Sequence, residues 1–144
     1  ESKVYFGSFW VNGFFEADLK EGKVTRLFEQ APPKGMTVPQ EVTYHGVQAV
    51  HDGIVLGANE GRSYLDAVDV KSGKLLDRLM DVARPCCIEP IPGGGKGSDA
   101  RVLLSNLGDG SLQVVDVSPE GKLRSLGKAQ VGKAPKRVAF LNAP

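Results

Sequence analysis

A short hairpin pattern occurs three times in this 144-residue chain and limits the folds that the chain can adopt. Each copy ends an apolar run on Asp, turns through Gly and restarts at Lys; the copies span 15–23, 66–74 and 114–122. The aspartates Asp18, Asp69 and Asp116 are 51 and 47 residues apart. An Asp carboxylate bonds backbone amides within a turn, and Gly adopts the positive φ that such turns need. The pattern predicts three equivalent β-hairpins, with these aspartates in structural roles.

A proline opens the strand before each hairpin and gives a second marker of the same period. Pro39, Pro85 and Pro135 are 46 and 50 residues apart. Each repeat of about 48 residues then holds four strands: a Pro-led strand, a strand such as 102–106, a strand that ends in Asp, and a Lys-led strand such as 74–82. Four strands in a repeat of this length are typical of a β-propeller blade.

The rest of the sequence agrees with an all-β fold. Its clearest apolar runs are short, and 18 glycines and nine prolines separate them; the runs are 4–10, 14–19, 54–58, 64–70, 101–105 and 112–117. No stretch of about 11 residues keeps a helical apolar spacing without a breaker. His51, Asp52 and Gly53 predict a tight turn in which His51 is exposed and inert.

The chain is predicted to be a single domain of three blades over residues 1–144. The second and third blades span 36–84 and 85–135, and the first combines 136–144 with 1–35, because the predicted strands 3–10 and 136–142 complete one blade. Propellers typically have four to eight blades. We therefore expect two copies to form a six-bladed ring, each donating its terminal strand to the other, or a companion propeller segment to complete the ring.

The third repeat resembles the YVTN-type and lactonase-like propeller families. The resemblance lies in residues 101–117, RVLLSNLGDGSLQVVDV, and 132–140, GKAPKRVAF; it is weaker in the second repeat, at 54–59 and 64–70, and covers only the hairpin of the first. Proteins of this kind include sugar lactonases, electron-transfer partners, surface-layer proteins and binding modules. The resemblance implies a fold rather than one chemistry.

Candidate functional residues lie in the Pro-led strands, because propeller sites form where loops meet the central channel. His45 and Glu41 are the catalytic candidates, and His45 is open to three interpretations: a general base, a metal ligand or a structural histidine. The channel-facing candidates for ligand binding are Tyr44, Cys86, Cys87 and Arg137. The adjacent cysteines are either two small strand residues or a vicinal disulfide.

A metal site is a further expectation that follows from the lactonase-like resemblance. Related six-bladed lactonases hold a divalent metal such as calcium with oxygen and nitrogen ligands. Glu41, Asn106 and Asp109 are the metal candidates, together with Asn59. Asn59 and Asn106 occupy equivalent repeat positions, so a shared role at the strand end is the alternative.

Charge and motifs narrow the function without identifying the ligand. The chain has 18 basic and 17 acidic residues, and the basic residues are not clustered, which argues against a nucleic-acid partner. No apolar run is long enough to span a membrane. The Gly-rich segment 92–97 lacks the residue spacing of a Walker phosphate-binding loop, so it does not predict a phosphate site. The leading hypothesis is a binding or scaffold protein for a small-molecule or protein ligand; the alternative is a metal-dependent lactonase-like hydrolase. The start at Glu1, the paired cysteines and the resemblance favour a secreted or periplasmic protein.

Overall fold

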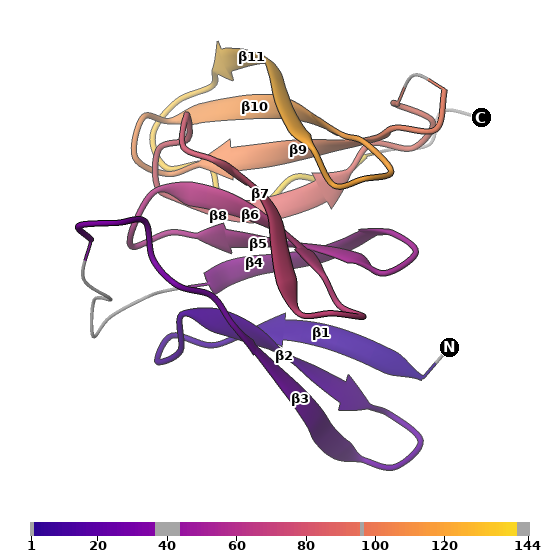
Figure 1. Ribbon diagram of the computed structural model, residues 1–144. Helices are drawn as coiled ribbons and strands as arrows, with labels where there is room; N and C mark the ends of the chain where they lie inside the picture. The colour runs from indigo at the N-terminus through magenta and orange to yellow at the C-terminus, as the bar shows by residue number, and fades with distance from the viewer. Residues whose placement is uncertain (1, 37–43, 96, 141–144) are drawn as a thin grey trace.

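The structure is a computed structural model that describes residues 2–36, 44–95 and 97–140, and it contains only strands as regular secondary structure there (Figure 1). The first sheet has the order β1 (Lys3–Gly7), β2 (Gly13–Asp18), β3 (Lys23–Glu29). The middle sheet has the order β4 (Tyr44–His51), β5 (Ile54–Asn59), β6 (Tyr64–Asp69), β7 (Lys74–Leu79). The last sheet has the order β8 (Pro85–Pro90), β9 (Ala100–Asn106), β10 (Ser111–Val117), β11 (Leu123–Gln130). The all-β prediction is confirmed, and no sheet closes on itself in this part of the chain.

The three sheets repeat one antiparallel unit. The outer hairpin of each sheet carries a register shift at the same place, between Glu16 and Ala17 in β2, between Ala67 and Val68 in β6, and between Val114 and Val115 in β10. Asn12, Asn59 and Asn106 also recur at intervals of 47 residues. In the described residues, the first sheet has no strand at the place that β4 and β8 take in the other two sheets.

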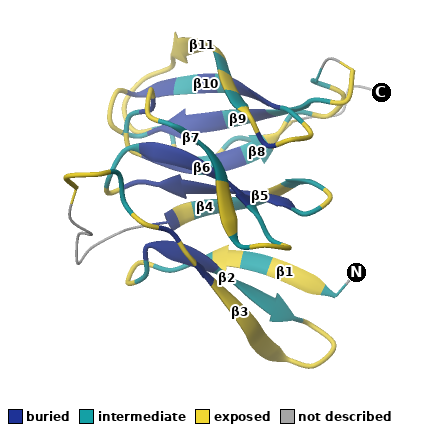
Figure 2. Cartoon of the chain, in the orientation of Figure 1, coloured by how far each residue is buried: buried dark blue, intermediate teal, exposed yellow. Residues whose placement is uncertain are grey.

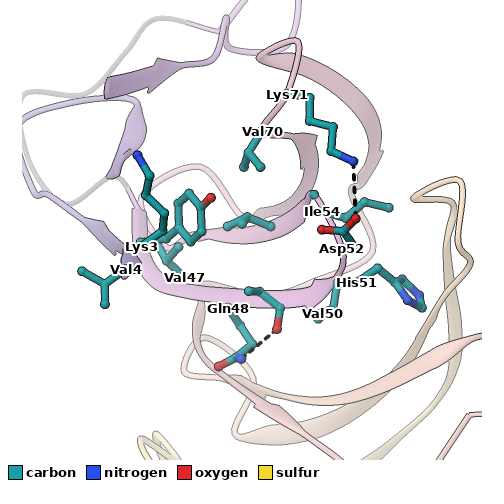
Figure 3. Close-up of a pocket in the computed structure, with 14 residues that line it drawn as sticks. Lys3, Val4, Val47, Gln48, Val50, His51, Asp52, Ile54, Val70 and Lys71 are labelled. Carbon is teal, nitrogen blue, oxygen red and sulfur yellow. Dashed lines mark hydrogen bonds and ion pairs between the residues drawn. The ribbon is translucent and has the colours of Figure 1, made fainter. Parts of the chain in front are cut away.

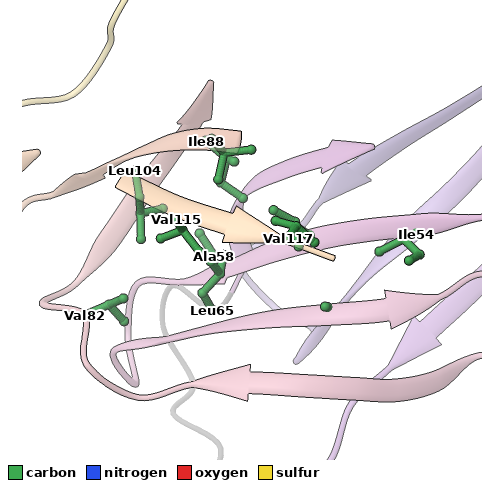
Figure 4. Packing of buried hydrophobic residues seen from close by; sticks show 11 residues of the cluster. Ile54, Ala58, Leu65, Val82, Ile88, Leu104, Val115 and Val117 are labelled. Carbon is green, nitrogen blue, oxygen red and sulfur yellow. The ribbon is translucent and has the colours of Figure 1, made fainter. Parts of the chain in front are cut away.

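The middle sheet is covered on both faces, which explains the uninterrupted apolar run of β5. All six residues of β5 are buried, as strands between two layers typically are. Ile54, Leu56 and Ala58 pack against the last sheet, in a cluster that also holds Val115 and Val117 (Figure 4). Figure 2 shows that β5 is buried, whereas much of β3 is exposed.

Aromatic residues fill the space between the first and middle sheets. Phe14 and Phe28 stack with ring centroids 4.9 Å apart, and Tyr44 and Tyr64 complete this cluster. Tyr44 is 1% exposed and its hydroxyl donates a hydrogen bond to Asp66. Tyr44 is predicted from the sequence to face the channel as a ligand-binding residue. This prediction is wrong: Tyr44 lies in the core, where its ring packs over Gly57.

Two of the three repeated aspartates form the predicted turns. Asp18 Oδ1 accepts hydrogen bonds from the amides of Lys20 and Glu21, and Asp69 likewise accepts from the turn that follows it. The prediction that Asp116 occupies the same turn position is wrong. Asp116 lies inside β10, because this turn is one residue longer.

Ser118 takes over the turn position in the third hairpin. Its hydroxyl accepts hydrogen bonds from the amides of Glu120 and Lys122 at 3.2 Å. Asp116 instead forms an ion pair with Arg101, at 2.6 Å between Nε and Oδ1, and a second with Arg124 at 2.9 Å. Asp116 therefore joins three strands of the last sheet rather than closing a turn.

Two other predictions need correction. His51 is not an exposed, inert turn residue: its Nε2 lies 2.9 Å from the carbonyl oxygen of Val117 and 3.3 Å from the amide nitrogen of Ala100, so it links the middle and last sheets. The predicted strand 136–142 is absent over 136–140; residues 141 and 142 lie outside the described residues. Within the described ranges, no helix has the length and apolar character needed to cross a bilayer.

Candidate functional site

A hollow of about 480 Å³ lies where β4, β8 and residues 136–138 meet. These are the segments that the proline pattern marks as innermost in each repeat. The polar and thiol side chains on its wall are His45, Cys86, Cys87, Glu89, Lys136 and Arg137. The structure thus brings together four of the sequence-predicted site residues, His45, Cys86, Cys87 and Arg137, and their role in binding stays a prediction.

Glu60 connects His45 to Arg84 beside this hollow. His45 Nδ1 lies 2.9 Å from Glu60 Oε2, and Arg84 Nη2 donates to Glu60 Oε1 at 2.6 Å. The Glu60 side chain is only 8% exposed, whereas that of His45 is 32% exposed. A buried carboxylate needs such partners, because an unpaired charge there would lose its hydration without compensation. Each oxygen of Glu60 therefore has a separate partner.

Sequence reasoning missed Glu60 and Arg84. Glu60 directly follows β5 in the segment Asn59-Glu60-Gly61-Arg62, whose composition is that of an exposed turn. Their positions relative to the strands could have indicated them. Glu60 directly follows β5, at the end of the sheet where β4 begins, and Arg84 directly precedes β8. Residues that flank inner strands at one end of a sheet converge there.

The backbone of Arg84 is strained, and a hydrogen bond to Ser63 supports it. Arg84 and Ser63 both adopt positive φ, 50° and 54°, which costs non-glycine residues on the order of 1 kcal/mol each. The Arg84 amide donates a hydrogen bond to Ser63 Oγ at 3.0 Å, so the two strained residues support each other. The guanidinium reaches Glu60 from this fixed backbone.

Cys86 and Cys87 are free thiols in this structure, with 3.6 Å between their sulfur atoms. Cys86 is fully buried and Cys87 is partly exposed. Burial, followed by the neighbouring Cys87 thiol, raises the pKa of Cys86 to about 12. The unliganded Cys86 is therefore protonated at neutral pH and is a poor nucleophile, since the thiolate is the reactive form.

Three potential donor atoms of different kinds lie close together here. A ring nitrogen of His45, a carboxylate oxygen of Glu60 and Cys86 Sγ are all within 4.8 Å of one another. They come from the start of β4, the residue after β5 and the start of β8. The ring of Phe9 contacts the histidine ring edge to face, with 5.6 Å between centroids.

The metal candidates from the sequence do not assemble with this cluster among the described residues. Asn106 is fully buried and its amide donates to Ser111 Oγ and Gln113 Oε1, at 3.1 and 3.0 Å. Asp109 is exposed and accepts a hydrogen bond from the Ser111 hydroxyl at 2.6 Å. Glu41, the second catalytic candidate and also a metal candidate, lies outside the described residues. The contacts of Asn106 are those of a strand-end role.

Asn59 has the same kind of surroundings as Asn106. Its amide donates to Asn12 Oδ1 at 2.7 Å and to the Tyr64 hydroxyl at 3.0 Å, and its Oδ1 accepts from the Arg62 amide. All of these bonds are inside the protein, where Asn59 is fully buried. Asn59 is therefore occupied in joining the first and middle sheets.

A larger hollow of about 820 Å³ borders β1 and the hairpin of β4 and β5 (Figure 3). Its charged side chains include Lys3 and the ion pair between Lys71 and Asp52, which are 3.4 Å apart. Both members of the pair are largely exposed, so the interaction contributes little. This hollow lies next to β1, an edge strand of the first sheet.

Comparison with known proteins leaves the family of this chain open. No family model matches the chain, and no curated protein matches it significantly. Its function is therefore interpreted from the geometry of the site.

Proposed function

We propose that the chain is half of a six-bladed β-propeller that binds its ligand in the hollow between β4, β8 and residues 136–138. The observation that carries this proposal is the convergence of three innermost segments, with their polar side chains, on one hollow. Other conspicuous polar residues, such as Asn59 and Asp116, are used in internal bonds. A concave site with a few converging polar groups is the usual form of a ligand site.

The free face of the first sheet supports completion of the ring by further sheets. Val4, Phe6 and Leu27 lie on the face turned away from the middle sheet and are 36%, 41% and 43% exposed. Phe6 stacks on Phe15 there at 5.4 Å between ring centroids. An apolar face of this kind on a protein surface marks an interaction site.

The last sheet offers a matching face for a second copy. Leu103 and Val114 are register partners on the face opposite the Val115 cluster, and both are only partly buried. Each sheet inside the chain packs face to face on its neighbour, so the same packing between the last sheet of one copy and the first sheet of another extends the existing arrangement. Two copies related by a two-fold axis close the ring with two identical contacts.

The edge of β1 supports the exchange of terminal segments between copies. β1 has a partner strand only on its β2 side in the described part of the first sheet, and the larger hollow lies beside it. Residues 136–140 follow Pro135 as β8 begins with Pro85, and they form no strand. Residues 136–138 line the hollow together with β8. In the proposed ring, this segment pairs with β1 of the second copy.

Binding is favoured over covalent catalysis by the state of the candidate groups. Cys86 is fully buried, and burial raises the pKa of its unliganded thiol; the Nδ1 atom of His45 is engaged by Glu60. Phe9, which is 49% exposed and contacts the ring of His45, adds aromatic surface of the kind that binding sites use. The YVTN-type resemblance and a location outside the cytoplasm remain predictions that agree with a binding propeller.

Hydrogen exchange of the full chain and of a chain that ends at residue 134 tests the exchange of terminal segments. We expect the amides of β1 to lose protection in the shortened chain, while those of β5, which is buried on both faces, keep theirs. Equal protection of β1 in both chains would show that residues 135–144 do not cover this edge and would overturn the proposed ring closure.

A further inference from the structure

We infer that His45, Glu60 and Cys86 form a binding site for a late first-row transition-metal ion, of which Zn²⁺ is the representative. The inference deepens the proposed function, since it rests on the hollow beside β4 and β8 as the binding site and assigns the class of ligand. It differs from the sequence-based expectation of a calcium site in both the residues and the metal.

The three donors have the composition of a transition-metal site. An imidazole nitrogen, a carboxylate oxygen and a thiolate sulfur are ligands of Zn²⁺, at about 2.0 to 2.3 Å from the ion. The donor atoms already lie within 4.8 Å of one another, so rotations of the side chains bring them onto one ion. Coordination replaces the proton of the Cys86 thiol, because a coordinating thiol is deprotonated. A sulfur donor excludes calcium as the preferred ion, since calcium takes oxygen ligands.

The surrounding residues orient the donors. Arg84 holds Oε1 of Glu60, which leaves Oε2 directed at His45. The ring of Phe9 restricts the imidazole, and the core restricts Cys86, which is fully buried. Outer partners that fix ligand orientation are a regular part of metal sites.

Three protein ligands leave one position of a tetrahedral ion open. Structural zinc sites use four protein ligands, whereas sites with three keep a position for water or an exogenous ligand. His45 and Cys86 also line the hollow, so the open position is expected to face it. Cys87 is the remaining nearby thiol, and its amide donates to Ser105 Oγ at 3.0 Å. Its sulfur lies outside the cluster of three donors.

Titration of the full, reduced chain with Co²⁺ tests this site, because Co²⁺ bound to a thiolate gives a charge-transfer absorption that needs no functional assay. We expect one Co²⁺ per chain, the absorption band, and loss of the band when Zn²⁺ displaces the Co²⁺. Cys87→Ser is the matched control and keeps the band, whereas Cys86→Ser lacks it. Absence of the band in the unmodified chain, or its persistence in Cys86→Ser, would overturn the inference.

Two further variants keep the test decisive if the buried Cys86→Ser chain fails to fold. Glu60→Gln and His45→Asn change donors that are less buried than Cys86. Each is expected to weaken Co²⁺ binding by at least the roughly 10- to 100-fold that loss of an outer partner costs, without loss of the far-ultraviolet circular dichroism. Unchanged affinity in both folded variants contradicts the site. All three donors belong to one chain, so metal binding does not require ring formation. Light scattering on the same samples measures ring formation separately.

Discussion

The Nδ1 atom of His45 lies 2.9 Å from the Oε2 atom of Glu60, although 15 residues separate the two in the chain. The pair forms because β4 and β5 are antiparallel neighbours, so the start of one strand lies beside the end of the other. It places a nitrogen and an oxygen donor next to the buried sulfur of Cys86. The identity of the donors, rather than their number, determines which ions the site selects.

Zinc and calcium are expected to differ in their effect on thermal stability. An ion that binds only the folded chain raises the free energy of unfolding by about 2.7 kcal/mol at 100 times its dissociation constant. We expect Zn²⁺ to raise the melting temperature of the reduced chain, a chelator to reverse the rise, and Ca²⁺ to have no effect. Differential scanning calorimetry measures all three. An equal rise with Ca²⁺ would contradict the sulfur-containing site.

Asn59→Ala is expected to destabilise the chain by about 2 to 4 kcal/mol, because it removes the bonds that Asn59 makes with the buried side chains of Asn12 and Tyr64 and with the partly buried amide of Arg62. Urea unfolding followed by circular dichroism measures the loss. Asp52→Ala is the control: that side chain is 94% exposed, so stability should stay unchanged within error. Equal stability of Asn59→Ala and the unmodified chain would show that Asn59 does not join the sheets.

Asp116→Asn is expected to change how stability depends on pH in the acid range. Hydrogen bonds from Arg101, and then from Arg124, lower the pKa of the Asp116 carboxyl below its usual value. Its contribution to stability is therefore present above the pKa of the unfolded chain and is lost as pH falls through the lower, folded pKa. The variant should be less stable at neutral pH and lose less stability on acidification. Urea midpoints at a series of pH values measure both effects.

Asp66 is expected to change the pH dependence of stability in the opposite direction to Asp116 and serves as the comparison. Burial raises the pKa of Asp66, although the ion pair with Arg78 acts against this rise. A raised folded pKa gives a contribution that is present below the unfolded pKa and is lost as pH rises through the folded pKa. Asp66→Asn should therefore make the acid loss of stability steeper. If Asp116→Asn and Asp66→Asn changed the acid loss of stability in the same direction, the environments assigned to the two carboxyl groups would be wrong.

Phe6→Glu is expected to separate ring formation from folding. Phe6 lies on the free face of the first sheet and is 41% exposed in the single chain, so the substitution should halve the mass in solution while the circular dichroism spectrum is retained. Leu19→Glu is the matched control: this residue is 65% exposed in the turn after β2 and should keep the mass of the unmodified chain. Light scattering after size-exclusion chromatography measures both. A Phe6→Glu chain with unchanged mass would remove this face from the interface.

The strands and two of the turns could be predicted from local sequence, because they depend on nearby residues. The uninterrupted apolar run 54–58 marks a strand buried on both faces, and Asp18 and Asp69 close turns with their own following amides. The turn position of Asp116 was predicted wrongly because the third turn has one extra residue before Gly121. Ser118 therefore accepts the turn hydrogen bonds, although the Asp, Gly and Lys of the repeat are all present.

The candidate site was only partly predictable, because it depends on which strands become neighbours. The proline pattern predicted that β8 and the strand that holds His45 lie innermost, and this prediction made His45 and Cys86 candidates. Glu60 escaped notice because a charged residue after a strand usually faces solvent, and only the approach of Arg84 and His45 explains its burial. Tyr44 was misassigned for the converse reason: its neighbour in sequence faces the hollow, but alternation along β4 turns Tyr44 into the core.

The central claim, that two copies complete one ring, is tested most directly by the mass of the full chain in solution at micromolar concentration. The chain has a mass of 15.4 kDa, and multi-angle light scattering should report twice this value. A mass of 15.4 kDa that persists as the concentration rises would contradict the ring of two copies.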